Sequence, residues 1–343
     1  QLSTMQGKTS IPLAEFDLGD IGTVAKLTST VTGDTLTTRD SGILLEGIDF
    51  PEPTLTFAIV AKTKADEDKL GNAISRLLEE DPTLRFEKNA ETRQTLITGM
   101  GEAHLNIIID RLKKFNVEVS TVEVKVPYRE TIRGTAQNVE GKHKKQSGGH
   151  GQYGHVKIDI APDPENDFTF EEKIFGGSVP KQYIPAVEKG MRESMAEGIL
   201  AGFPVTNIKI TLTDGSYHDV DSSEMAFKIA ANLAFKAACA QAKPILLEPV
   251  MDVDILVPDQ YMGDIMSDMN TKRGRIMGME KHGNRQLIHA QAPLTEMYRY
   301  SIDLKSITQG RGKFTMKFSR YEEVPSMIAD KVIAQAKADK ENE

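Results

Sequence analysis

The sequence of 343 residues predicts an α+β protein built from several domains. Three observations support this prediction. The chain is too long for one compact core, which favours two to four domains. The element order β-α-β-β-α-β, known as the split βαβ unit, fits the sequence twice. Between the two copies, a glycine-rich loop leads into a strand of alternating apolar and polar residues.

Residues 1–48 are predicted to be all-β, because runs of Thr, Val and Leu are separated by glycine-containing turns. The segment is too short for a complete barrel, so we expect it to be the tail of a larger domain. Gly7-Lys8-Thr9 resembles the end of a phosphate-binding loop, but that motif needs a glycine where Leu2 stands. The sequence therefore predicts no nucleotide-binding loop in this chain.

The first split βαβ unit lies in residues 50–120. Apolar residues at helical spacing predict one helix around Leu70 and Leu77 and a second around Leu105 and Leu112. The apolar runs before, between and after these helices predict strands at 55–60, 83–87, 94–98 and 116–120.

The second copy lies in residues 247–324 and follows the same order. Gly274 is expected to end its first helix. The predicted elements are strands at 250–257, 275–280, 286–293 and 314–321, and helices at 260–271 and 294–304.

Two more helices are predicted between the copies. The first has apolar residues at helical spacing between Pro180 and Gly198. The second begins at Asp221, where Glu224 three residues later completes a capping box. The tail, residues 325–343, is predicted to be a charged helix that docks on a neighbouring domain.

Composition limits the class of protein. The sequence has no apolar run of membrane-spanning length and no charged-then-apolar leader at its start, so we expect no membrane association. The single Cys239 excludes a disulfide framework and is compatible with a reducing compartment. The net charge of −8 argues against generic nucleic-acid binding. An acidic chain can still carry a local basic tip that binds RNA, because the field of the contacting face is what matters.

The glycine-rich loop is the strongest candidate for function. Four glycines occur within residues 148–154, directly after a basic cluster of Lys142, His143, Lys144 and Lys145. Loops that bind mononucleotides open a helix, whereas this loop leads into a strand. A basic finger with one aromatic side chain fits single-stranded or looped RNA better, and the alternative is a flexible surface turn. The candidate RNA-binding residues are Lys144, Gln146, Ser147, Gly148, Gly149, His150, Gly151, Gln152 and Tyr153.

Residues 214–224 form a second polar loop that contains His218 and Asp219. Asp221 and Glu224 are assigned to helix capping, which leaves too few ligands for a dedicated metal site. A recognition loop is favoured over a turn without a role, and both are favoured over acid–base or metal catalysis. His218 and Asp219 therefore join the candidate RNA-binding set.

Two further clusters have structural alternatives. The basic residues Lys272, Arg273, Arg275, Lys281, His282 and Arg285 are either a solvated face or a second contact with RNA or ribosomal protein, with Lys272, Arg273, Arg275 and Arg285 as its main candidates. The turn before Leu105 could bind an anion at a helix N-terminus, but Glu102 would repel one. A structural role is therefore expected for His104.

A set of segments in a fixed order identifies a family. The segments are Pro51-Glu52-Pro53, Ala61-Lys62-Thr63-Lys64-Ala65-Asp66, Glu79-Glu80-Asp81-Pro82, Gly99-Met100-Gly101-Glu102, Ser147-Gly148-Gly149 with Gly151-Gln152-Tyr153-Gly154, Tyr217-His218-Asp219-Val220-Asp221-Ser222-Ser223-Glu224 and Arg311-Gly312-Lys313-Phe314-Thr315-Met316. With them the chain resembles translation elongation factor G over essentially its whole length.

The resemblance implies a domain plan. Residues 1–48 correspond to the last part of the β-barrel second domain, and residues 50–120 to a ferredoxin-like third domain. Residues 121–246 with the final helix 325–343 correspond to an elongated fourth α/β domain with a ribosomal-protein-S5-like fold. Residues 247–324 correspond to a ferredoxin-like fifth domain.

The resemblance also implies a function. The family moves tRNA and mRNA through the small ribosomal subunit with GTP, and the tip of its fourth domain enters the decoding region, with His218 facing the tRNA–mRNA duplex. The expected partners are the ribosome, with its rRNA and proteins, tRNA and mRNA, and a cytoplasmic monomer is expected. This chain is expected to be no enzyme and to hold no cofactor, because GTP and Mg²⁺ would bind the family's GTPase domain.

Departures from the family pattern at Ala103, Asn106 and His150 leave open a specialised paralogue. Two alternatives are also open. One is a ribosome-protection or recycling factor of the same architecture, and the other is an enzyme that uses His218 and Asp219.

Overall fold

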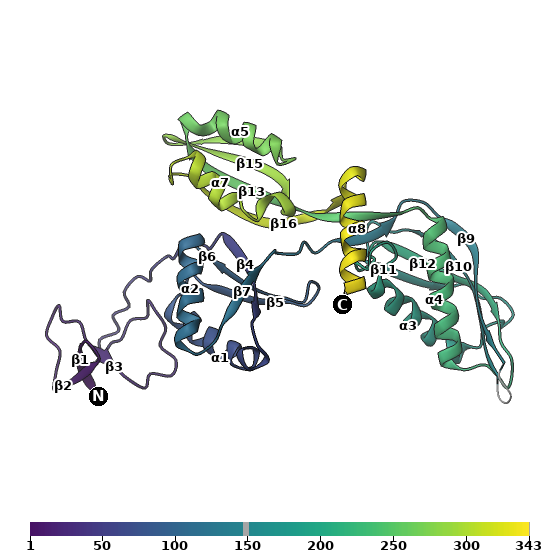
Figure 1. Ribbon diagram of the computed structural model, residues 1–343, viewed down its shortest axis with the longest axis horizontal. Helices are drawn as coiled ribbons and strands as arrows, with labels where there is room; N and C mark the ends of the chain where they lie inside the picture. The colour runs from purple at the N-terminus through teal and green to yellow at the C-terminus, as the bar shows by residue number, and fades with distance from the viewer. Residues whose placement is uncertain (147–150, 343) are drawn as a thin grey trace. The chain divides into compact units, whose positions relative to one another are not determined.

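The computed structural model describes residues 1–146 and 151–342 (Figure 1). The chain divides into two compact units, of which the first holds residues 1–88 and 95–122 and the second holds residues 89–94 and the chain from 123 onward. The fold is α+β with several separate sheets, which confirms the predicted class. Among the described helices, none has the length and apolar character needed to cross a membrane.

The first unit contains a split βαβ domain, as predicted. Its strands pair in the order β5-β6-β4-β7, and the helices supply buried Leu70, Ile74, Leu105 and Ile108 to its core. Its elements are β4 (Leu55–Ala61), α1 (Lys64–Glu80), β5 (Arg85–Asn89), β6 (Gln94–Gly99), α2 (Glu102–Lys114) and β7 (Val119–Val122).

The second strand of this domain begins two residues later than predicted. The Asp81 carboxylate accepts hydrogen bonds from both the backbone N–H and the hydroxyl of Thr83, at 2.9 and 2.6 Å. The backbone N–H of Leu84 also donates to the Asp81 carbonyl. These contacts hold residues 81–84 in a turn, so Thr83 and Leu84 are not free to pair in the sheet.

The prediction of an all-β segment at 1–48 is only partly right. Three short strands, β1 (Leu2–Gln6), β2 (Thr9–Leu13) and β3 (Thr23–Val24), form a sheet in the order β2-β1-β3. In the described chain, residues 25–54 contain no helix or strand. A strand needs a paired neighbour that satisfies its backbone groups and covers its apolar face. These residues have no such neighbour, and side chains such as Leu36 and Leu44 are exposed.

The second unit contains a four-stranded sheet in the order β11-β12-β10-β9, with β11 and β12 parallel and the other pairs antiparallel. Figure 1 shows β9 and β10 as a long hairpin that runs beside α4. Val156, Ile158 and Ile160 point from β10 into the core, as the predicted alternation requires. The elements are β9 (Ala136–Lys145), β10 (Gln152–Pro162), β11 (Phe168–Glu172), α3 (Ile184–Glu197), β12 (Ile208–Ser216) and α4 (Glu224–Gln241).

The same unit contains the second split βαβ copy, with strands in the order β14-β15-β13-β16. The helix predicted at 294–304 is two short helices, because Arg299 leaves helical geometry (φ −107°, ψ 4°) while the apolar spacing continues. The elements are β13 (Pro244–Pro258), α5 (Met262–Thr271), β14 (Arg275–His282), β15 (Arg285–Pro293), α6 (Leu294–Met297), α7 (Tyr300–Ile307) and β16 (Lys313–Glu323).

Strand β13 is longer than predicted. Its first residues pair with β8 (Arg129–Ile132) and the rest pair with β15 and β16. The final helix, α8 (Ser326–Asn342), packs Ile328 and Val332 against a small apolar cluster of Tyr128, Leu246 and Val324. Ile328 and Val332 of the tail thus pack against a core, as the sequence suggested, whereas Met327 is exposed.

Candidate nucleic-acid interface

The described part of the basic finger, residues 142–146 and 151–153, lies at one end of the β9–β10 hairpin. Lys144 pairs in register with Tyr153, and Lys145 pairs with Gln152. Lys142, Lys144, Lys145 and Gln146 are all exposed. Ser147, Gly148, Gly149 and His150 were also predicted to contact RNA, but they lie outside the described residues.

The second predicted loop follows β12 and ends at α4. The capping box predicted from Asp221 to Glu224 is wrong, because the helix begins at Glu224 and its N-cap is Ser223, whose side chain accepts from the Ala226 N–H. Asp221 instead accepts a hydrogen bond from the backbone N–H of Gly151, 2.9 Å from its Oδ1. A carboxylate that could have capped a helix is therefore used to hold the finger.

Three further contacts join the two loops. The Tyr153 N–H donates to the Asp221 carbonyl over 2.8 Å, and the Ser222 hydroxyl donates to the Tyr153 carbonyl over 2.9 Å. The Tyr153 hydroxyl lies 2.7 Å from Ser216 Oγ. The structure thus brings the two loops together, although about 70 residues separate Tyr153 from Ser222.

His218 stands at this junction. Its ring centroid is 6.5 Å from that of Tyr153, and its side chain is 57% exposed. The carboxylate nearest its ring belongs to Asp221, 3.5 Å from Nδ1, and not to Asp219, the partner that the enzymatic alternative named. Tyr217 and Val220 beside it are also exposed, which gives the loop an aromatic and an aliphatic surface.

The finger concentrates positive charge around one aromatic ring. Lys142 Nζ lies 5.9 Å from the centre of the Tyr153 ring, within the range of a cation–π contact. The His143 ring meets Gln152, with Nε2 2.9 Å from Oε1. Exposed lysines and a partly exposed aromatic side chain are the groups that pair with phosphates and stack on unpaired bases.

His155 contacts the junction of the two loops through Ser216. Its Nδ1 lies 2.7 Å from Ser216 Oγ, the atom that also contacts Tyr153. Its Nε2 is 3.0 Å from Glu140 Oε1 but is not aligned for a hydrogen bond. Burial lowers the pKa of His155, and the charges of Lys142 and Lys157 act in the same direction, whereas Glu140 opposes them. The lowered pKa favours the neutral form of this ring, which lies beside Ser216.

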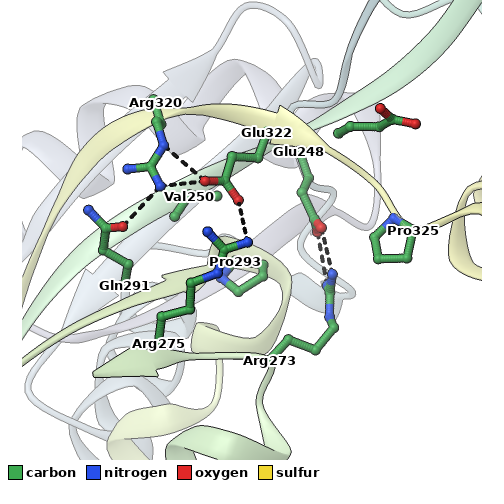
Figure 2. A pocket seen from close by; sticks show the side chains of 10 residues that line it. Glu248, Val250, Arg273, Arg275, Gln291, Pro293, Arg320, Glu322 and Pro325 are labelled. Carbon is green, nitrogen blue, oxygen red and sulfur yellow. Dashed lines mark hydrogen bonds and ion pairs between the residues drawn. The ribbon is translucent and has the colours of Figure 1, made fainter. Parts of the chain in front are cut away.

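The second predicted contact is largely occupied by the protein's own carboxylates (Figure 2). Arg273 forms a bidentate pair with Glu248, whose side chain is only 3% exposed, and also contacts Glu296. These bonds raise the pKa of Arg273, and they hold a residue with φ of 56°, in the left-handed region that a side chain disfavours. Arg273 therefore closes the end of α5 and is not a free surface cation.

The neighbouring basic residues are also paired. Lys272 lies between Asp268 and Asp303, which raise its pKa although burial acts to lower it. Arg275 lies 3.5 Å from Glu322, which also pairs with Arg320. These arginine and glutamate side chains, together with Gln291, line a cavity of about 130 Å³ (Figure 2). Arg285, which is half-buried at the start of β15, is the remaining predicted member.

His104 has the structural role that was expected. Its Nε2 lies 2.8 Å from Asp81 Oδ2, and its Nδ1 accepts from the Met100 N–H at 3.1 Å. Both ring nitrogens therefore tie α2 to neighbouring turns. Across residues 1–146 and 151–342, no group of three His, Cys, Asp or Glu side chains is arranged to hold a metal ion.

The predicted RNA-binding set leaves out Lys142 and Ser222, and the sequence misassigned Asp221. Ser216 begins the loop, residues 216–219, that the resemblance places at the tip, but its contact with Tyr153 was not expected. Lys142 was visible as part of the basic cluster. The others gave no local signal, because their partners Gly151 and Tyr153 are 63 to 70 residues away in the chain.

Comparisons with known proteins agree with this architecture. Three family models match in succession: domain III of elongation factor G over residues 50–123, domain IV over 124–243, and the elongation factor G C-terminus over 245–332. A crystal structure of a protein from Thermus thermophilus is similar, with 40% sequence identity and a TM-score of 0.82. The match covers 98% of this chain and 51% of that chain, so the present chain spans about half the length of its structural relative.

Proposed function

The chain belongs to the elongation factor G family, and from this membership we propose that it is the ribosome-binding part of a factor that drives translocation of tRNA and mRNA. Its partners in this proposal are ribosomal RNA and proteins, tRNA and mRNA in the cytoplasm, and it acts as a monomer. GTP and Mg²⁺ bind a further domain of the parent protein, so the residues of this chain carry no catalysis.

One observation carries the proposal. Two loops far apart in sequence, one basic and one with His218, are hydrogen-bonded into a single exposed end of the second unit. An end of this kind suits a positional role. The lysines would neutralise phosphates, Tyr153 and His218 would stack on or hydrogen-bond to bases, and the body of the tip would occupy space that a moving tRNA has left.

The proposal requires no covalent chemistry at the tip. In the full-length parent, hydrolysis of GTP would supply the driving force, and the tip would prevent the tRNA from returning. Phosphate contacts from Lys144 and Lys145 would weaken as salt rises, because binding releases counterions, whereas the contribution of His218 would depend on shape and hydrogen bonding.

The test is His218→Ala in a family protein that carries these residues together with its GTP-binding domain. We expect slower translocation in a single-turnover assay and nearly unchanged ribosome-stimulated GTP hydrolysis, because the hydrolytic site is on another domain. His289→Ala, which removes a partly exposed histidine that contacts Asp254 in the second split βαβ copy, is the matched control. Unchanged translocation in the His218 variant would contradict the proposed role of the tip.

A recycling or ribosome-protection factor of the same architecture is the second candidate, because it would use the same tip. Splitting of post-termination ribosomes by a protein that fails to translocate would favour this candidate. The two assays on one preparation therefore separate the possibilities.

A further inference from the structure

Asp221 makes four contacts that converge on the tip. Its Oδ1 accepts from the Gly151 N–H at 2.9 Å, and its carbonyl accepts from the Tyr153 N–H at 2.8 Å. Its own backbone N–H points at the His218 ring, 3.3 Å from Nδ1. Its Oδ2 lies 3.5 Å from the same nitrogen, a contact that is an ion pair only when the ring is protonated. One residue thus touches the backbone of Gly151, the backbone of Tyr153 and the ring of His218.

The backbone at Gly151 lies against this carboxylate. A Cβ added at Gly151 would lie 3.0 to 3.2 Å from the Asp221 carboxyl atoms, closer than a normal contact. Glycine at this position therefore allows the backbone to approach the carboxylate closely enough to donate to it. The glycine and the aspartate form a matched pair across the two loops.

The contacts of His218 indicate which ring nitrogen carries the proton in the neutral ring. Two backbone N–H groups, of Val220 and Asp221, point at Nδ1, each at 3.3 Å. A nitrogen that accepts hydrogen bonds carries no proton, and a ring turned over would place a C–H against both donors. In the neutral ring the proton is then on Nε2, which acts as a hydrogen-bond donor.

The backbone around the ring is fixed as well. The His218 N–H donates to Ser222 Oγ at 2.9 Å, and the His218 carbonyl accepts from the Ser222 N–H at 3.1 Å. Ser222 Oγ in turn donates to Tyr153. The ring therefore projects from a closed turn that is tied to the finger on one side.

We propose that Asp221 is a positioning residue that ties Gly151 and Tyr153 to the His218 turn and selects the Nε2–H tautomer of the neutral His218 ring, so that the tip presents a hydrogen-bond donor to an acceptor atom of RNA. The identity of the partner rests on the proposed function, whereas the tautomer and the tie are properties of the chain alone. The acceptor is a phosphate, ribose or base oxygen or a base nitrogen, because these are the acceptors that RNA offers.

The tie can be tested on the chain of 343 residues with ¹⁵N-labelled histidine, followed by long-range ¹H–¹⁵N NMR at pH 8. We expect His218, assigned from the signal lost in His218→Gln, to show a protonated Nε2 and an unprotonated Nδ1. In Asp221→Ala the bond to Gly151 is lost, so the turn should no longer hold the two backbone N–H groups against Nδ1, and the two tautomers should average. Asp221→Asn should retain the native signal, because its side-chain oxygen can still accept from Gly151.

Asp163→Asn is the matched control, since Asp163 accepts backbone hydrogen bonds next to the opposite end of β10. This variant should leave the His218 signal unchanged. A protonated Nδ1 in the wild type, or a native tautomer in a folded Asp221→Ala, would overturn the proposal. Loss of the native tautomer in Asp221→Asn would also overturn it, because the tie would then depend on charge and not on the hydrogen bond.

The donor role can be tested in the parent factor. The amide nitrogen of Gln reaches the position of imidazole Nε2, whereas that of Asn reaches only the position of Nδ1. We expect translocation by His218→Gln close to wild type and by His218→Asn slowed about tenfold, as loss of one hydrogen bond implies. Equal rates for these two variants would overturn the donor role. Unchanged translocation in His218→Ala would instead reject the proposed function and leave the NMR result to decide the tautomer.

Discussion

At the residue scale, Gly154 shows how the finger is attached to the helix beside it. A Cβ at this position would lie 2.4 Å from the Ala226 carbonyl oxygen and 2.8 Å from the Phe227 nitrogen. Both atoms are backbone of α4, so no side chain can rotate away. This glycine of the motif therefore serves packing inside the protein.

Gly154→Ala should separate β10 from the start of α4 and lower the free energy of unfolding by about 1–3 kcal/mol, as expected for overpacking. Gly263→Ala is the control, because Gly263 lies in α5 with no atom within 4 Å of an added Cβ. That change should be neutral or stabilising by up to about 1 kcal/mol. Urea unfolding followed by circular dichroism measures both, and equal stabilities would contradict the steric argument.

His155 makes the stability of the folded chain depend on pH, and the direction of its pKa shift gives the sign of this dependence. Burial lowers its pKa below the ordinary 6.5, so the unfolded chain binds a proton at a higher pH than the folded chain. The stabilising effect of the neutral ring is therefore present above pH 6.5 and is lost as pH falls through and below that value. The measurement is the urea concentration at the midpoint of unfolding, between about pH 7.5 and about pH 5.5, a window that spans the ordinary histidine pKa. As pH falls across this window, the midpoint should decrease less in His155→Gln than in the wild type. A steeper loss in the variant would show that the sign is wrong.

At the element scale, the loop between α3 and β12 is organised by one buried carboxylate. Glu130, on β8, is fully buried and accepts hydrogen bonds from the consecutive backbone N–H groups of residues 199–203. Such a loop would otherwise leave its donors unsatisfied inside the protein. The contact joins a strand to a loop about 70 residues later, and it fixes the path of the chain from α3 into the central sheet.

Glu130→Gln should therefore destabilise the second unit by about 2–4 kcal/mol, because the amide NH₂ would face donors and leave a buried group unpaired. Hydrogen exchange at residues 199–203 should accelerate together with the loss of stability. Glu188→Gln is the control, since Glu188 pairs with Arg192 on the surface of α3. Its effect should stay below about 1 kcal/mol. A similar small effect for both changes would show that the five donors are satisfied in another way.

At the scale of the whole molecule, nucleotide binding is expected to lie outside these residues. The sequence lacks the phosphate-loop pattern, since Leu2 stands where Gly7-Lys8-Thr9 would need a preceding glycine, and the glycine-rich finger leads into a strand. The chain of 343 residues should therefore show no saturable binding of a fluorescent GTP analogue in a titration up to micromolar protein. Binding in that range would contradict the assignment of GTP to a separate domain.

Much of the fold could be predicted because its signals are local. The apolar spacing of Leu70, Ile74 and Leu77, for example, predicts a helix whose inner face is buried as observed. Errors occurred where an element depends on distant partners. Residues 25–48 contain strand-forming residues but find no neighbour to pair with, and the turn at Asp81 removes two residues from a predicted strand.

For the candidate site, the sequence by itself determined which loops are polar, basic and rich in glycine, because composition and turn residues are properties of short segments. It also determined the family, through the order of its motifs. Only the tertiary structure decided that Asp221 holds Gly151 and not a helix end, and that Arg273 is committed to Glu248. The physical reason is common to both: a charged side chain takes the partner that reduces the penalty of its burial most, and here that partner lies 25 to 70 residues away in the chain.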